Sequence, residues 1–169
     1  MMDRTLPSVG DIRIMEARGP WKSKSGGDLQ VVFSLPFDIL LQEYLRYPRS
    51  EEGKPDIRGL RVYTVRGVDP GCIGGTEWHH AREEMVYVLE GLFRWRCEDG
   101  WGNKREFTLD PEHGIWMPPC ILHEYEALVK NSGLLVVANT TFDPDDPSTH
   151  DTFSDAEFRK HQAEVADPY

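Results

Sequence analysis

Four side chains of types that bind metal ions or transfer protons occur in a two-part spacing within this 169-residue chain. The first part holds Glu77, His79 and Glu84, and the second ends at His123 after an apolar run. Because Glu77 and His79 are two residues apart, both side chains leave the same face of a strand. Two carboxylates and two imidazoles suit one divalent ion of Zn, Fe, Mn or Ni, with positions left open for water or substrate. We therefore expect these four residues to bind a divalent metal ion.

The same residues allow other interpretations. His79 could have no role beyond a hydrogen bond at the polar mouth of the barrel. The acidic residues could simply be solvated, as is usual near strand ends. His80 competes with His79 as the ligand. Its gap to Glu84 is shorter, but its side chain would leave a strand on the face opposite to Glu77.

Composition limits the classes of partner. The net charge of −10 and the isoelectric point near 5.0 argue against nucleic acid and against an anionic membrane, because both require a basic surface. A phosphorylated metabolite needs only a local pair of arginines, so we expect a small-molecule substrate. Three cysteines do not suggest a disulfide framework, and the N-terminal residues lack an apolar signal region. We expect a cytoplasmic protein.

The elements that must position these side chains are predicted to be strands. Polar and apolar residues alternate in 61–66 and 93–97, which predicts strands with one buried face. Short apolar runs at 115–117 and 134–138 predict buried strands, and turn sequences such as Asp99-Gly100 separate the segments. Many short strands at regular spacing predict a sandwich or a jelly-roll barrel.

The chain divides into three parts. Residues 1–30 mix charges, Gly and Pro, which predicts an irregular arm with one strand near 11–16 that packs on a partner subunit. We expect the barrel over 31–153, with a helix near 36–47 whose apolar residues have helical spacing. A Ser-x-x-Glu capping box then predicts a C-terminal helix within 154–169.

The two-part spacing resembles the cupin superfamily. Its first motif is Gly-x5-His-x-His-x3–4-Glu-x6-Gly, which here runs from Gly71 to Gly91 with Glu77 in place of the first His. Its second motif is Pro-x-Gly-x2-His, in which Cys120 replaces the Gly. This resemblance implies an all-β fold, the cupin-type double-stranded β-helix or jelly-roll barrel. It also implies a homodimer that forms through the sheets.

A narrower resemblance comes from runs that follow one another along the chain. Residues 114–119 (Gly-Ile-Trp-Met-Pro-Pro), 133–139 and 142–146 are similar to runs of the nucleotide-sugar 3,4-ketoisomerase branch of cupins, called WxcM-like. The Arg-Val-Tyr at residues 61–63 is also similar to that branch. The branch's Arg-Gly-x-His-Ala-His, however, is here Gly-Gly-Thr-Glu-Trp-His at residues 74–79. The resemblance implies an isomerase that moves a carbonyl along a sugar.

A ketoisomerase removes a proton beside a carbonyl and returns it to the neighbouring carbon. With a free imidazole, His79 would be the base, Tyr63 the proton donor and Glu77 the group that orients the imidazole. With a metal bound, the ion would polarise both oxygens, and Tyr63 or His80 would move the proton. His79 cannot be both ligand and base.

Three residues are candidates for substrate binding. Arg61 shares a strand face with Tyr63 and could bind a diphosphate, although it could also form only a salt bridge. Trp78 could stack on a sugar or pack in the core. His80 lies beside Trp78 and could contact the substrate.

Three classes of function remain. The first is an isomerase or epimerase of a nucleotide-linked keto sugar, acting by enolisation. The second is a metal-dependent dioxygenase or decarboxylase of a small organic acid or phenol, because open positions on Fe or Mn admit oxygen. The third is a barrel that binds a small molecule without catalysis. The fold alone does not choose among them.

Overall fold

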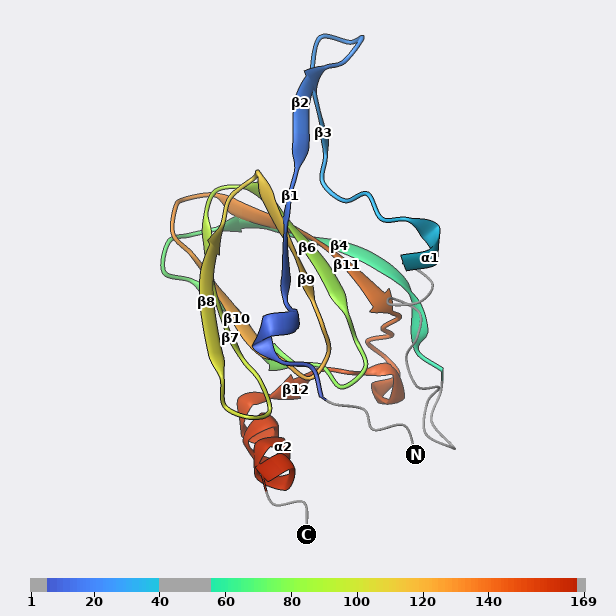
Figure 1. The fold of residues 1–169 in the computed structure, drawn as a ribbon, viewed down its shortest axis with the longest axis vertical. Coiled ribbons are helices and arrows are strands. Elements are labelled where there is room, and N and C mark those ends of the chain that lie inside the picture. The colour runs from blue at the N-terminus through green and yellow to red at the C-terminus, as the bar shows by residue number, and fades with distance from the viewer. Residues whose placement is uncertain (1–5, 40–55, 167–169) are drawn as a thin grey trace.

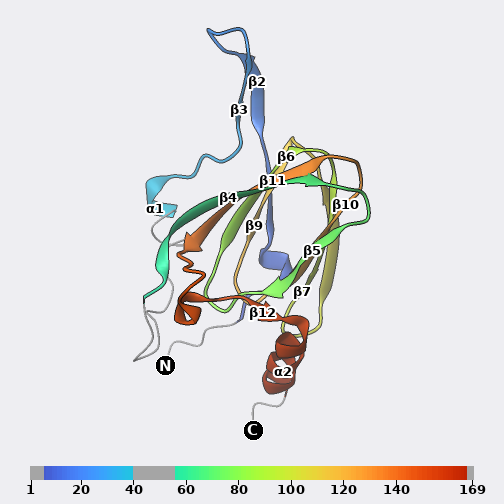
Figure 2. The same cartoon turned by 180° about the vertical axis from the view of Figure 1, so that it is seen from behind.

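The computed structural model describes residues 6–39 and 56–166 of the chain. Within these ranges, two five-stranded antiparallel sheets face each other and enclose the main core (Figures 1 and 2). The first sheet has the order β1-β9-β6-β11-β4, with bounds Arg13–Glu16, His113–Met117, Glu84–Glu90, Ser132–Thr140 and Arg58–Val68. The second has the order β12-β5-β10-β7-β8, with bounds Phe153–Ser154, Ile73–Trp78, Leu122–Ala127, Phe93–Glu98 and Lys104–Leu109. The predicted all-β jelly-roll fold is confirmed.

Alternation along the strands places one face of each sheet on the core. In β4 every second residue from Arg61 to Val65 is partly buried, while Val62 between them is exposed. In β7, Phe93, Trp95 and Cys97 are buried as predicted. Side chains of both sheets meet in one apolar cluster, and removal of this surface from water stabilises the barrel.

The turn after β7 lies where the sequence predicts it, and the turn after β6 depends on a glycine. The hairpin between β7 and β8 is closed by Asp99, whose Oδ1 accepts the backbone N–H groups of Trp101 and Asn103 at 3.0 Å each. Between β6 and β7, Gly91 has a φ of 87°, and a Cβ at this position would lie 2.7 Å from the Cα of Ser132. The second turn therefore depends on glycine, because an L side chain would be strained and would also collide with β11.

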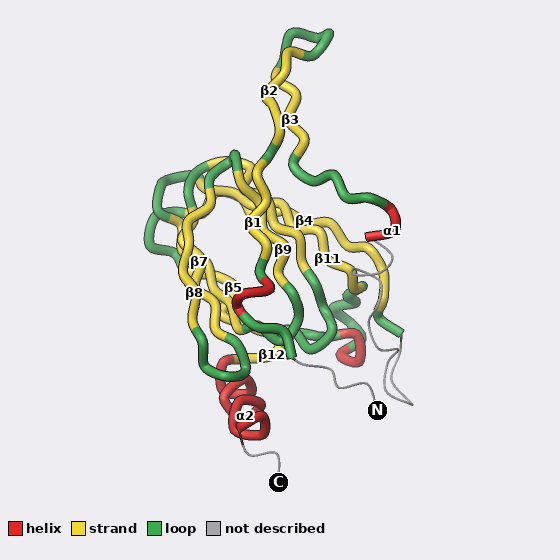
Figure 3. The backbone as a smooth tube through the Cα atoms, in the orientation of Figure 1, coloured by secondary structure: helices red, strands yellow, loops and turns green. Residues whose placement is uncertain are grey.

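The N-terminal part contains more regular structure than the irregular arm that we predicted. β1 lies within the expected 11–16 segment and pairs with β9. It is followed by β2 (Arg18–Lys22) and β3 (Asp28–Val31), which form a hairpin that extends away from the barrel (Figure 3). Of the Gly and Pro residues behind the irregular-arm prediction, Gly26 and Gly27 lie in the turn of this hairpin, whereas Gly19 and Pro20 lie within β2 itself.

Helices are few among the described residues. α1 covers Phe37–Ile39, and most of the helix predicted near 36–47 lies outside the described residues. α2 covers Asp155–Ala166 and begins at the predicted capping box, where the Ser154 backbone N–H donates to Glu157 Oε2 at 2.8 Å. Short 3-10 turns occupy Val9–Asp11 and Pro147–Thr149. None of the described helices is long and apolar enough to cross a bilayer.

Candidate functional site

The structure brings the four predicted metal ligands into one region, and three of them form a group whose ligand atoms all lie close together. Glu77 lies near the end of β5, His79 follows that strand, and His123 in β10 is the cross-strand partner of Glu77. One ligand atom from each of these residues lies within 4.8 Å of the other two. Both imidazoles are buried, whereas 31% of the Glu77 side chain is exposed. The even spacing of Glu77 and His79 therefore places both side chains toward His123, as strand geometry requires.

Backbone carbonyls orient both histidines in the same way. His79 Nδ1 lies 2.6 Å from the carbonyl oxygen of Asp151, and His123 Nδ1 lies 3.0 Å from that of Ile121. Because a carbonyl oxygen only accepts hydrogen bonds, each Nδ1 carries a hydrogen, which leaves Nε2 as the ring nitrogen that faces the other members of the site. These Nε2 atoms lie 3.8 and 3.7 Å from the carboxylate of Glu84. Two basic nitrogens thus face one small region.

The fourth predicted ligand, Glu84, already has hydrogen-bond partners. Its Oε1 accepts from the hydroxyl of Tyr63 at 3.1 Å and from Arg82 Nη1 at 3.3 Å. The same Nη1 lies 3.3 Å from His79 Nε2. Sequence reasoning did not predict this buried guanidinium. We call these six residues the site cluster: Tyr63, Glu77, His79, Arg82, Glu84 and His123.

Burial sets the protonation of two members of the site cluster. The pKa of His79 is held well below its ordinary value by burial first, and then by the nearby His123 and Arg82. Burial raises the pKa of Tyr63, and the negative charge of Glu84 raises it further. At neutral pH the imidazole of His79 is therefore an uncharged base, and the phenol of Tyr63 keeps its proton.

Arg61 lies next to the site cluster on the same face of β4 as Tyr63. Its guanidinium lies 5.1 Å from the ring centre of Tyr63 and 5.1 Å from that of Phe142. The Nε of Arg61 is buried and has no hydrogen-bond partner among the described residues. A buried N–H group without an acceptor lowers the stability of the folded protein, unless a bound ligand accepts its hydrogen bond.

Two predicted substrate-binding residues do not join the site cluster. Trp78 leaves β5 on the other face and is buried in a second apolar cluster, with its ring 4.9 Å from that of His161 and 5.1 Å from that of Phe153. His80 is exposed, and its ring lies 6.1 Å from Trp78. The position of Trp78 follows from alternation, because it is one residue from Glu77 in β5, whereas His80 lies in the loop that follows this strand. Neither side chain has a contact with the site cluster among the described interactions.

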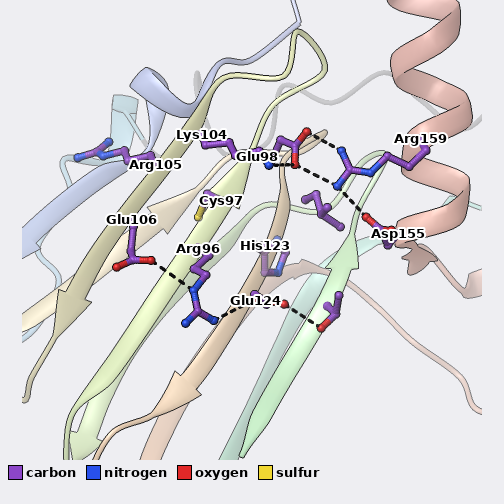
Figure 4. A pocket seen from close by; sticks show the side chains of 12 residues that line it. Arg96, Cys97, Glu98, Lys104, Arg105, Glu106, His123, Glu124, Asp155 and Arg159 are labelled. Atoms are coloured by element: carbon purple, nitrogen blue, oxygen red, sulfur yellow. Dashed lines mark hydrogen bonds and ion pairs between the residues drawn. The ribbon is translucent and has the colours of Figure 1, made fainter. Parts of the chain in front are cut away.

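A groove of about 580 Å³ lies on the outer side of β7, β8 and β10, beside the start of α2 (Figure 4). Its three arginines already have partners, and Arg105 donates to the backbone carbonyl oxygens of Val9 and Ile12 at 3.1 and 2.7 Å. Arg96 contacts Glu124 at 2.9 Å and Glu106 at 3.3 Å, and Arg159 contacts Asp155 at 2.9 Å. The groove therefore offers no free guanidinium to an anion, and we place the functional site at the site cluster.

Sequence reasoning missed two residues that shape the site, Arg82 and Asp151. Arg82 stands between His79 and Glu84 in the first motif, so a charged residue inside that motif was the available signal. Its direction could not be predicted, because residues 79–83 form a loop without a regular period. Nothing in the sequence pointed to Asp151, which is remote along the chain.

A jelly-roll barrel with inward-facing Glu and His side chains defines a cupin-type protein. The family model described as "FdtA: WxcM-like, C-terminal" matches residues 54–157, and the chain belongs to this family. The resemblance to the WxcM-like branch is thereby confirmed. A search of curated proteins finds no match.

Solved structures share the fold. The chain is 18% identical to QdtA, a sugar 3,4-ketoisomerase from Thermoanaerobacterium thermosaccharolyticum in complex with TDP, with a TM-score of 0.62 over 95% of this chain and 98% of that one. It is 19% identical to the WlaRB TDP-quinovose 3,4-ketoisomerase from Campylobacter jejuni, with a TM-score of 0.62 over 90% and 99% of the two chains. The dTDP-4-dehydrorhamnose 3,5-epimerase from Bacillus anthracis is 13% identical, with a TM-score of 0.58 over 83% and 81%. At these identities the likeness shows a common fold.

Proposed function

We propose that this protein is an isomerase of a nucleotide-linked keto sugar that acts by enolisation. The observation that carries the proposal is the neutral, buried His79, whose Nε2 lone pair faces the interior between an arginine and a carboxylate. Membership of the WxcM-like family supports it. So do the sugar ketoisomerases that share the fold.

His79 is the proposed base. Its Nε2 takes the proton from the carbon beside the carbonyl, so that a C–H bond breaks and an N–H bond forms. The electron pair moves onto the carbonyl oxygen, where the Arg82 guanidinium stabilises the negative charge and the Tyr63 hydroxyl donates a hydrogen bond. The hydroxyl proton on the carbon that lost its hydrogen then passes to the former carbonyl oxygen, so that the second O–H bond breaks as the first forms. His79, whose N–H proton exchanges with water, returns a proton to the former carbonyl carbon, and the carbonyl re-forms one position along. The depressed pKa of His79 keeps the base form available throughout the neutral range.

Arg61 is the proposed contact for the diphosphate. Its buried Nε lacks a partner among the described residues, and the adjoining ring of Phe142 is 41% exposed. Guanidinium groups bind phosphate oxygens through paired hydrogen bonds. The nucleotide would therefore lie on the side of β4 where Arg61 and Phe142 meet. Trp78 and His80 take no part in this arrangement.

The donor set also fits a divalent ion. Glu77, His79 and His123 would hold it, since both Nδ1 atoms are fixed by carbonyl groups in the way that orients metal-binding histidines. A bound Zn, Fe, Mn or Ni ion would polarise the substrate oxygens as a Lewis acid. The contact between Arg82 Nη1 and His79 Nε2 occupies the same lone pair, so it competes with such an ion and must give way to the substrate before His79 accepts a proton. The same donors support the second candidate, a metal-dependent dioxygenase or decarboxylase.

One experiment separates these possibilities. The purified protein is incubated in D₂O with TDP-4-keto-6-deoxyglucose, the ligand named for a QdtA complex, and with other keto-sugar nucleotides. We expect deuterium at the carbon beside the carbonyl and a 3-keto product. His79→Gln should lower this rate by roughly 100-fold or more, whereas His113→Gln, at the far end of β9, should not. Absence of exchange across the panel would exclude the isomerase.

Elemental analysis of the same preparation tests the metal. Stoichiometric iron, with oxygen consumption that chelation abolishes and iron restores, would favour the dioxygenase instead. We also propose a cytoplasmic homodimer, on the cysteine content and the habit of cupins. Sedimentation velocity that shows a compact monomer would contradict the dimer.

A further inference from the structure

We propose that Asp151 is a positioning residue that fixes the direction and the tautomer of His79 and holds the loop that carries Arg82. The inference rests on the proposed function, because it assigns a role in presenting the proposed base. Asp151 lies in the C-terminal segment, between the 3-10 turn at Pro147–Thr149 and strand β12. No chemistry with the substrate is assigned to Asp151.

The carboxylate of Asp151 holds the loop between β5 and β6. It accepts three consecutive backbone N–H groups, from His80 at 3.0 Å, Ala81 at 2.9 Å and Arg82 at 2.7 Å. Asp151 is 5% exposed, so these hydrogen bonds are protected from water. A carboxylate can satisfy three such donors because both of its oxygens accept. Loss of the carboxylate would leave buried amides unpaired, which is costly.

The backbone of Asp151 acts on the imidazole itself. Its carbonyl oxygen lies 2.6 Å from His79 Nδ1, and this contact selects the tautomer in which Nε2 is the unprotonated nitrogen. The next residue, Thr152, accepts from Arg82 Nη2 at 3.0 Å. The same short segment therefore positions both the proposed base and the proposed cation.

The tautomer matters because Arg82 Nη1 donates toward His79 Nε2 at 3.3 Å. In the other tautomer, Nε2 would carry a hydrogen, two donors would face each other, and no lone pair would be directed at a substrate. The hydrogen bond to Asp151 therefore has a chemical consequence beyond holding the loop. A residue that served stability alone would not control which nitrogen is basic.

The test compares Asp151→Asn with Asp146→Asn. Asp146 is a matched control, because its exposed carboxylate also caps a backbone N–H, that of Ser148, but lies away from the site cluster. Three quantities are measured for each protein: kcat and KM for the keto-sugar nucleotide, the melting temperature, and the tautomer of His79 by ¹⁵N NMR of the ring nitrogens. The His79→Gln protein assigns the ring signal.

We expect the wild-type ring to carry its hydrogen on Nδ1. Asp151→Asn should reduce kcat by about 10- to 100-fold with little change in KM, and should add the second tautomer to the spectrum. Asp146→Asn should leave both kcat and the tautomer of His79 unchanged. The proposal is overturned if wild-type His79 carries its hydrogen on Nε2, a measurement that needs no variant to fold. It is also overturned if folded Asp151→Asn keeps both the wild-type tautomer and kcat. If no keto sugar reacts, the proposed function fails, and the tautomer still decides the role of Asp151.

Discussion

Replacing Phe158 with Ala tests how α2 is held on the barrel. The Phe158 side chain is 0% exposed and packs in the second apolar cluster, with its ring 5.8 Å from that of Trp78. Truncation removes a whole ring from a site where the rigid sheet cannot collapse around the cavity. Phe-to-Ala changes in such cores cost about 3–5 kcal/mol. This is a large part of the stability of an ordinary domain.

The expected loss can be measured by heat and by denaturant. For a protein of this size, each kcal/mol lowers the melting temperature by about 2–4 °C, so Phe158→Ala should melt roughly 6–20 °C below wild type. In urea the midpoint should fall while the m-value stays unchanged, since the folded state remains equally compact.

A control variant removes an even larger ring from an exposed position. Trp21 in the protruding hairpin is 50% exposed, and Trp21→Ala should cost less than about 1 kcal/mol. The reasoning is refuted if Phe158→Ala unfolds within 1 kcal/mol of wild type, or if the control variant is equally destabilised. Either result would mean that α2 is not anchored by this cluster.

Three further predictions concern titration, thiol access and a turn. Burial, and then the nearby His80, lower the pKa of His161 below its ordinary value of 6.5. Below about pH 6.5 the unfolded chain therefore binds a proton at His161 that the folded protein does not bind, and this lowers the stability of the folded state. His161→Phe should reduce the loss of melting temperature between about pH 8 and pH 5.5. Burial raises the pKa of Cys97 to about 12 and that of Cys120 to about 11, whereas Cys72 is exposed, so one thiol of three should react with an aromatic disulfide reagent until the protein is denatured. Gly91→Ala should destabilise by more than about 1 kcal/mol in urea unfolding, because its φ of 87° disfavours a side chain and the added Cβ would meet the neighbouring strand.

The strands of the barrel were predictable by two signals: those with one face on the core and one face outside alternate, and those buried on both faces, such as β9 and β11, are continuous apolar runs. Alternation records this difference directly, as in β4 and β7. The β2–β3 hairpin was missed for the same reason. Every residue of β2 is exposed, so its sequence carries no alternation that could signal burial.

The site was predictable only where strands direct the side chains. Glu77 and His79 share a face by their spacing, and the second motif supplied His123. Arg82 lies in a loop, where residue order does not fix direction. Asp151 reaches that loop from 69 residues farther along the chain, and such contacts depend on the complete topology. The sequence therefore predicted the donor atoms more completely than their electrostatic surroundings.

The strand order has a consequence for how the chain reaches its native state. Among the described strands, only β2–β3 and β7–β8 pair with their immediate neighbours in sequence. β1 must wait for β9, which is synthesised about a hundred residues later, and β4 must wait for β11. Closing such large loops is slow compared with forming local contacts. A nascent polypeptide cannot complete either sheet until nearly all of it has left the ribosome, so early fragments should depend on chaperones to avoid aggregation.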